Sequence, residues 1–352
     1  MQKQLSDISL NISEEEYREN RAIHYSTLSR FYREGFYCVK SIYEPVTSPS
    51  LTFGSMVDEL LLSGMAAFES KFTIADTSLD YETCNVIKAI YDTFKDQYNQ
   101  FIKIPIQQVS AIAKSCGFWA ADKWSDNTRY NSLLKKGNIE QYYQYLKSSE
   151  GKTVVTKQMY EEALQCVNAL RSSESTGFYF YDNIAGNPIQ RYNQLKFSAT
   201  IDGIDYISML DLIVVDYKNK KIYPCDLKTT SSNESEFYKS FIKWDYFVQA
   251  KLYSRVLEEN IRKDDYFKDF EIENFTFIVV NKKNLTPLTW RYGDTFIYTP
   301  QTYGKNKQIE IPNIFELAKE LNYYLEHPER TVPIDINQCG TNSIVEYLNK
   351  LV

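Results

Sequence analysis

The stretch that decides the fold is MLDLIVVDYKNKKIYPCDLKTT, residues 209–230. Two apolar, β-branched-rich runs flank the polar turn YKNK, and this pattern predicts a β-hairpin. Outward from the hairpin, similar apolar runs bounded by polar turns predict further strands at 191–200 and 274–283. Helical spacing of apolar residues predicts helices at 25–40, 51–64, 156–172, 236–260 and 311–327. Helices and hairpins around one sheet indicate an α/β or α+β core.

The hairpin register places three polar side chains together. A turn centred between Lys218 and Asn219 sets Asp211 opposite Asp226. Side chains alternate between the two faces of a strand, so Lys228 shares a face with Asp226. We therefore expect both carboxylates and the lysine to lie within a few ångströms of each other on one face.

Two carboxylates at that spacing repel, and a buried carboxylate is costly without a partner. A divalent cation resolves both problems, because Mg²⁺ binds one or two carboxylates and keeps water and substrate phosphate as further ligands. Lys228 adds a positive charge that can act on a water molecule or on a phosphoryl oxygen. This set is typical of metal-assisted phosphodiester hydrolysis. The alternative is a structural ion pair between Lys228 and one aspartate.

A further acid lies in the predicted helix at 51–64. Its apolar residues form one stripe, made of Phe53, Met56, Val57, Leu60 and Leu61. Asp58 lies at the edge of this stripe, one turn after Gly54, where it is a candidate third metal ligand. The alternative is an ordinary surface acid. Glu59 is expected to point outward into solvent.

The predicted helix at 236–260 carries Gln249 and Tyr253 four residues apart, so the two side chains lie on one face. Taken alone, this pair is explained by packing and a hydrogen bond.

The composition excludes several classes of protein. The chain has 352 residues, 40 Lys+Arg against 46 Asp+Glu, and only two histidines, His24 and His327. An HExxH motif and a three-histidine zinc site are therefore excluded. The six cysteines are scattered without a CxxC motif, so no iron–sulfur cluster is expected. The polar, acidic start of the chain and its short apolar runs predict a cytoplasmic protein with reduced thiols and no membrane partner.

Four ordered motifs now stand out: GSMVDELLL at 54–62, LDLIVVD at 210–216, CDLKTT at 225–230 and QAKLY at 249–253. Together with the helix at 25–40, this set resembles the RecB-like branch of the PD-(D/E)XK nuclease superfamily. The closest resemblance is to the exonuclease VIII-type (RecE-like) enzymes of phages and prophages. The resemblance covers residues 25–64 and about 185–285. It implies an α/β fold with a restriction-endonuclease-like core, in which a mixed central β-sheet is flanked by helices, and with a large helical insertion.

The resemblance also implies roles for individual residues. Asp211 and Asp226 would bind Mg²⁺ or Mn²⁺, the backbone carbonyl of Leu227 would complete the shell, and Lys228 would be the catalytic lysine. Asp58 stands where the family has a histidine. The glycine of the family's second motif is replaced as well, by Ser208. Gln249 and Tyr253 would contact DNA or position the groups of the metal site. Thr229, Lys218 and Lys221, on or beside the hairpin, are further candidate DNA-binding residues.

The function implied is an Mg²⁺-dependent deoxyribonuclease, namely an exonuclease in the recombination or DNA processing of a phage or prophage. The resemblance further implies double-stranded ends as substrate, 5′→3′ polarity, a ring-shaped homo-oligomer and a single-strand-annealing protein as partner. Basic residues interleaved with aromatic ones suit DNA contacts. Besides the two lysines above, the candidates are Lys220, Lys282, Lys283, Lys123, Arg129, Lys135 and Lys136, with Trp119 and Trp124. The alternative is a non-catalytic DNA-binding or scaffold protein on a degenerate nuclease fold.

Three segments are predicted along the chain. Residues 1–64 hold the first helices of the nuclease core, 65–150 form the helical insertion, and 151–352 hold the catalytic hairpin and the C-terminal helix.

Overall fold

The computed structural model describes residues 2–149, 151–293, 301–302, 305–306 and 311–331. The chain forms two compact units. Unit 1 comprises Met1–Thr47, Ser173–Asn281 and Thr286–Val352, and unit 2 comprises Ser48–Ser172 and Lys282–Leu285. These boundaries differ from the three predicted segments, because 48–64 and 151–172 group with the insertion.

Contacts between segments far apart in the sequence explain that grouping. In unit 2, strand β1 (Phe72–Ala75) pairs in parallel with β2 (Thr153–Thr156), which ties both ends of the insertion together. Helix α3 (Pro49–Asp58) also packs against α9 (Lys157–Ser172), so the 48–64 segment belongs with residues 157–172.

Unit 1 contains the sheet and the helices that cover it. Its helices are α1 (Glu14–Glu19), α2 (Tyr25–Glu34), α10 (Phe237–Lys243), α11 (Tyr246–Lys263) and α12 (Ile314–Glu326), with short turns η1 (Leu5–Ile8), η2 (Gly35–Ser41), η5 (Gly177–Phe180), η6 (Glu234–Glu236) and η7 (Pro328–Thr331). Its strands are β3 (Ile189–Ile201), β4 (Ile204–Asp216), β5 (Lys221–Thr230), β6 (Glu271–Ile272), β7 (Phe275–Asn281), β8 (Leu288–Tyr292), β9 (Gln301–Thr302) and β10 (Lys305–Asn306).

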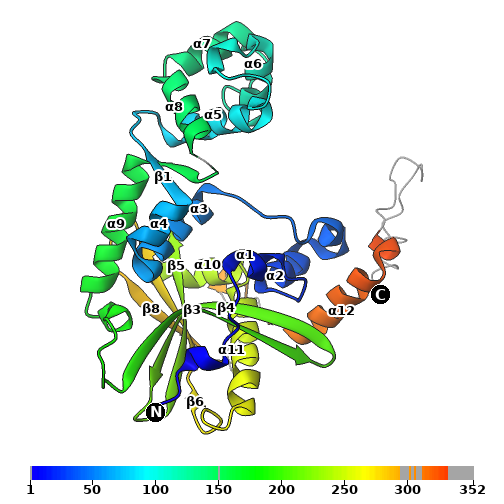
Figure 1. Ribbon diagram of the computed structural model, residues 1–352. Coiled ribbons are helices and arrows are strands. Elements are labelled where there is room, and N and C mark those ends of the chain that lie inside the picture. The colour runs from blue at the N-terminus through cyan, green and yellow to red at the C-terminus, as the bar shows by residue number, and fades with distance from the viewer. Residues whose placement is uncertain (1, 150, 294–300, 303–304, 307–310, 332–352) are drawn as a thin grey trace. The chain divides into compact units, whose positions relative to one another are not determined.

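The central sheet is mixed, as predicted. Its strand order is β3-β4-β5-β7-β8, with β6 beside β5. The β5–β7 pairing is parallel, whereas β3–β4, β4–β5 and β7–β8 are antiparallel. Helices α2, α11 and α12 contact one another, and α11 packs on β3 and β4. Figure 1 shows α11 beside the long β3–β4 hairpin. The predicted α/β class with helices flanking a mixed sheet is therefore confirmed.

The hairpin register is also the predicted one. Strands β4 and β5 are paired from Leu212↔Cys225 to Asp216↔Lys221. The inward side chains of this hairpin belong to the core of unit 1, where Ile213, Val215 and Ile222 are fully buried. A one-residue slip would exchange the two faces of each strand, so the register decides which side chains share a face.

The helix predicted at 236–260 is broken. Helix α10 ends at Lys243 and α11 begins at Tyr246. Between them Asp245 adopts a left-handed conformation with φ 56°, and its carboxylate forms an ion pair with Arg33 of α2 at 2.9 Å. The apolar pattern continues through the bend, so the pattern alone gave no sign of it.

Unit 2 is mostly helical. Its helices are α3 (Pro49–Asp58), α4 (Met65–Lys71), α5 (Tyr81–Phe94), α6 (Ile106–Ser115), α7 (Asp126–Leu134), α8 (Ile139–Ser148) and α9 (Lys157–Ser172), with the π-helical turn η3 (Glu59–Ser63) and the short turn η4 (Phe101–Lys103). Its strands are β1 (Phe72–Ala75) and β2 (Thr153–Thr156). Helices α5 to α8 share their own apolar core, which includes Ile87, Leu133 and Tyr143.

The helix predicted at 51–64 begins at Pro49 and changes to π-helical geometry after Asp58. This change turns Glu59 inward. The expectation that Glu59 lies in solvent is wrong, because its side chain is buried and forms an ion pair with Lys71.

Candidate active site

The candidate site lies where β4 and β5 separate. Past Leu212↔Cys225, β5 pairs on its other side with β7, from Cys225↔Thr276 to Thr230↔Asn281. The corresponding part of β4 receives the N-terminal segment instead, through the bridge Ile23↔Tyr206. Asp211 is one residue beyond the last β4–β5 pair, and its Oδ2 accepts a hydrogen bond from the Leu227 backbone N–H at 2.9 Å. A side chain thus replaces a strand partner at this opening.

The Leu227 bond also orients a second oxygen. The N–H and C=O of one strand residue point to the same side. Since the Leu227 N–H is directed at Asp211, the Leu227 carbonyl faces β4 as well. Its predicted use as a backbone ligand is compatible with this direction.

Asp226 is the most enclosed acid of the site. Only 2% of its surface is exposed. Its Oδ1 accepts a hydrogen bond from Nε2 of Gln249, which α11 brings over this part of the sheet. Its Oδ2 forms an ion pair with Nζ of Lys228, two residues further along the same strand face. The structure therefore brings together the predicted residues Asp211, Asp226, Lys228 and Gln249.

The ammonium of Lys228 lies between acids and aromatic rings. Nζ is 4.8 Å from the ring centroid of Tyr246, a cation–π contact. Burial lowers the pKa of Lys228, but the Asp226 carboxylate, the Tyr246 hydroxyl and the Asp211 carboxylate raise it, and the net shift is upward.

Three further tyrosines face these acids. Burial, the neighbouring Tyr17 hydroxyl and the Asp226 and Asp211 carboxylates raise the pKa of Tyr253 well above its usual value. Burial raises the pKa of Tyr17 to about 12, although a hydrogen bond with Tyr253 opposes that shift. Burial likewise raises the pKa of Tyr25, while Lys228 lowers it. Tyr17, from α1, and Tyr25, from α2, thus join the site from the N-terminal segment.

The sequence patterns indicated no site role for Tyr17, Tyr25 or Tyr246. Tyr246 had a usable signal, because it is three residues before Gln249 and seven before Tyr253 and shares their helix face. Tyr17 and Tyr25 had none, since a bridge between Ile23 and β4 brings them to the site.

The residues present fit a hard divalent cation. Two carboxylates and a backbone carbonyl are oxygen donors of the kind Mg²⁺ prefers, with water filling the remaining positions. Asp226 Oδ2 and Gln249 Oε1 are both buried without a hydrogen-bond partner. Asp226 Oδ2 is contacted by the ammonium of Lys228, with which it forms an ion pair. Within the described residues, no group of three or more His, Cys, Asp or Glu side chains could hold a metal ion.

Asp58, the proposed third ligand, is the last residue of α3 in unit 2, and its side chain is partly buried. Asp211 and Asp226 belong to unit 1. Its role as a ligand stays a prediction.

The predicted DNA-binding residues lie partly on the hairpin and partly on α11. Tyr253 is one helical turn from Gln249. Thr229 follows Lys228 on β5, so its side chain lies on the strand face opposite Asp226 and Lys228. Lys218 is exposed in the turn, and Lys221 forms ion pairs with Glu271 and Glu273. Lys221 is five strand residues from Asp226, about 17 Å, so the structure does not bring the turn lysines to the acids.

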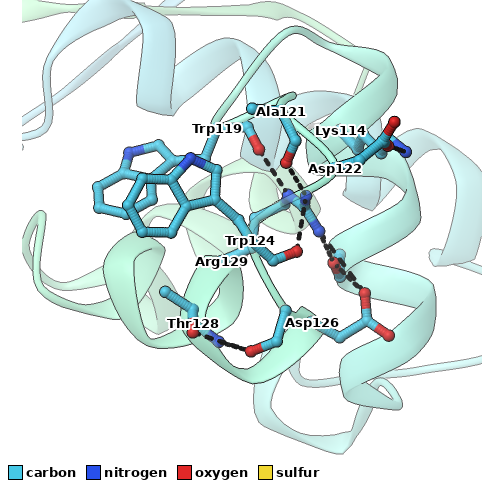
Figure 2. A network of polar contacts seen from close by, with 10 residues as sticks. Lys114, Trp119, Ala121, Asp122, Trp124, Asp126, Thr128 and Arg129 are labelled. Atoms are coloured by element: carbon cyan, nitrogen blue, oxygen red, sulfur yellow. Dashed lines mark hydrogen bonds and ion pairs between the residues drawn. The ribbon is translucent and has the colours of Figure 1, made fainter.

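Arg129 is a clear correction. It was a candidate DNA contact, but only 3% of its surface is exposed. Figure 2 shows its guanidinium inside a loop of unit 2, where it donates to the carbonyls of Trp119 at 3.0 Å and Trp124 at 3.3 Å and to Ser110 Oγ at 2.6 Å. Arg129 therefore shapes the loop. Lys136 pairs with Asp80 at 2.9 Å, which also reduces its availability.

Comparison with known proteins adds little. No protein-family model matches the chain, and no curated protein matches it. One solved structure with some likeness is a "Putative exonuclease" from Eubacterium rectale, with a TM-score of 0.39 and 12% identity, covering 92% of this chain and 85% of that chain. A likeness this low carries no argument about function.

Among the described residues, no helix combines the length and apolar character needed to cross a membrane. Cys38, Cys84, Cys116, Cys166 and Cys225 are free thiols. Cys339 lies outside the described residues.

Proposed function

We propose that the chain is a metal-dependent DNA exonuclease that hydrolyses phosphodiester bonds. The observation that supports it is the convergence of Asp211, Asp226, Lys228 and Gln249 where β4 and β5 separate. Two carboxylates, an ammonium and an amide from three elements at one opening are more than a single structural ion pair requires.

In this proposal each residue has a distinct part. Asp211 and Asp226, with the Leu227 carbonyl, hold Mg²⁺ or Mn²⁺, which supplies charge neutralisation at the scissile phosphate. Gln249 holds Asp226 in place through its Oδ1. Lys228 places a positive charge where negative charge develops on the phosphoryl oxygens. Tyr246 limits the motion of that ammonium by its ring contact.

A digestion assay tests the proposal. End-labelled linear DNA and matched circular DNA are incubated with the protein in Mg²⁺ or in EDTA. The proposal predicts loss of linear DNA in Mg²⁺, nucleotides released from the ends, and neither in EDTA. Cleavage of circular DNA would make it an endonuclease, and equal products in EDTA would refute the metal requirement.

A second candidate is a non-catalytic DNA-binding or scaffold protein. The lack of any three-ligand group among the described residues favours it, as does the direct Lys228–Asp226 ion pair. Such a protein binds DNA with unchanged affinity in EDTA and releases no nucleotides in Mg²⁺.

Finer properties are proposed on the family resemblance alone. They are a role in phage or prophage recombination, action on double-stranded ends with 5′→3′ polarity, a ring-shaped homo-oligomer and a single-strand-annealing partner. Light scattering after gel filtration tests the oligomer, and selective labelling of 5′ or 3′ ends tests the polarity.

Asp58 is proposed as a third carboxylate ligand on the same resemblance. The expected result is that Asp58→Ala loses most activity and Asp58→His keeps part of it, since imidazole also binds divalent metals. Wild-type rates for Asp58→Ala would make Asp58 an ordinary acid.

A further inference from the structure

Trp244 is an exposed tryptophan next to the candidate active site. It occupies the bend between α10 and α11, with 46% of its surface exposed. Two residues later, the ring of Tyr246 contacts Lys228. We propose that Trp244 is a stacking platform for a base of the DNA strand being cleaved. This inference rests on the proposed function.

The backbone of Trp244 is held firmly. Its carbonyl accepts a hydrogen bond from the Tyr25 hydroxyl at 2.9 Å, and its N–H donates to the Ser240 carbonyl at 3.0 Å. The next residue, Asp245, has φ 56° and is anchored by Arg33. A left-handed conformation is unfavourable for a non-glycine residue, so contacts from α2 maintain this bend. Those contacts present a large apolar side chain to solvent.

The surroundings of the ring favour a nucleic-acid ligand. The ammonium of Lys243 is 4.8 Å from the ring centroid of Trp244, so an aromatic face and a positive charge lie side by side. This is the combination that single-stranded nucleic-acid sites use, with the base on the ring and the phosphate near the cation. Because any base can stack, such a contact positions the strand without selecting its sequence.

The distance along the chain limits which base is bound. Two residues span at most about 7 Å of backbone, so the Trp244 backbone stays within that distance of Tyr246. Successive nucleotides are spaced at about 3.4 Å along a duplex axis. The stacked base therefore lies within a few nucleotides of the scissile phosphate held at Lys228.

The test compares the affinity of the protein for DNA ends that carry bases with its affinity for DNA ends that lack them. Wild type, Trp244→Ala, Trp244→Phe and the control Tyr323→Ala, an exposed aromatic residue of α12, are titrated with labelled duplex ends. Ca²⁺ replaces Mg²⁺, and the labelled DNA carries either normal nucleotides or abasic sites at its last three positions. Stacking predicts that Trp244→Ala weakens binding of normal DNA about 10-fold. It also predicts little change for Trp244→Phe and Tyr323→Ala, and no further loss for Trp244→Ala on abasic DNA.

Two outcomes overturn the inference: unchanged affinity of Trp244→Ala, or an equal loss on normal and abasic DNA, which would indicate a contact with phosphate or a structural effect. If Trp244→Ala fails to fold, Trp244→Gln and the wild-type preference for normal over abasic ends decide in its place. The proposed function is scored separately by wild-type cleavage in Mg²⁺. Cleavage with an unaffected Trp244→Ala rejects only the stacking role, whereas wild type that neither binds nor cleaves DNA rejects both.

Discussion

At the scale of single residues, substitution of Asp226 is expected to reduce the cleavage rate most. It is buried, and both of its oxygens are committed, one to Gln249 and one to Lys228. Asp226→Asn keeps the shape but removes the charge, so cleavage should fall roughly 1,000-fold, or about 4 kcal/mol of transition-state stabilisation. The rate of nucleotide release measures this, and circular dichroism checks the fold. Asp216→Asn, at the turn end of β4, is the control. Near wild-type cleavage by Asp226→Asn would remove Asp226 from the mechanism.

Lys228 and Lys221 form a matched pair on one strand. Lys228 faces Asp226, whereas Lys221 faces Glu271 and Glu273 at the other end of β5. Lys228→Ala should lower turnover about 100-fold or more and leave Mn²⁺ affinity largely intact, because the ammonium acts on the substrate. Lys221→Ala should leave both unchanged. Turnover at saturating Mn²⁺ and calorimetric Mn²⁺ binding provide the measurements. A collapse of Mn²⁺ affinity with turnover preserved would mean that Lys228 is structural.

Part of the candidate site could be predicted from the sequence. Asp211, Asp226 and Lys228 could be placed together because the two-residue period of a strand and the polar turn fix which side chains face each other. Arg129 was misjudged, because a cationic side chain is normally solvated. Its burial depends on carbonyls of a loop, and no sequence pattern predicts the shape of that loop.

At the scale of elements, the α10–α11 bend depends on Asp245. Burial raises the pKa of its carboxyl group, although Arg33 opposes the shift, so the ionised form is not favoured by folding. Asp245→Asn should therefore change the free energy of unfolding little, because asparagine tolerates the left-handed conformation. Asp245→Ala should cost about 1–2 kcal/mol. Urea unfolding of both variants decides, and equal losses would show that charge rather than backbone conformation sets the bend.

The N-terminal segment that carries the tyrosines should respond to pH through His24. Its ring packs on Tyr17 and its Nε2 contacts the Asn20 carbonyl at 2.8 Å. Burial lowers the pKa of His24 below its usual 6.5. At low pH the unfolded chain therefore binds a proton at His24 more readily than the folded chain does. The contribution of His24 to the free energy of unfolding is complete above pH 6.5 and is lost as the pH falls toward the pKa of the folded state. The loss is at most about 1.4 kcal/mol per pH unit.

Urea unfolding at pH 7.5 and pH 5.5 measures this dependence. Wild type should lose more stability between the two pH values than His24→Gln does. The same loss in both proteins would assign the pH dependence to other groups.

The elements themselves were more predictable than their interruptions. The strands of the hairpin and the C-terminal helix follow their apolar patterns closely, because local periodicity and burial agree there. The break at Asp245 and the π-helical turn at Glu59 escaped prediction, because Arg33 and Lys71, each distant in sequence or on another element, stabilise them.

At the scale of the whole molecule, the two units have separate apolar cores. Leu133 is fully buried in the α5–α8 core, and its neighbour Leu134 is 41% exposed. Leu133→Ala should destabilise by about 3 kcal/mol, whereas Leu134→Ala should have little effect. Hydrogen exchange should accelerate in α5–α8 of Leu133→Ala and stay unchanged in β3–β5. Uniform acceleration through both units would mean that they unfold as one.

The hydrogen bond from Leu227 to Asp211 has a consequence for lineages that lose activity. That N–H lacks a strand partner at the opening, so an acceptor at position 211 serves folding as well as chemistry. In an inactive descendant, selection on the fold would still retain Asp211, while Asp226 and Lys228 would be released together as a buried pair that folding does not need. An aspartate at position 211 is therefore a poor marker of an active enzyme. Loss of activity in a related protein is better indicated by substitutions at positions 226 and 228.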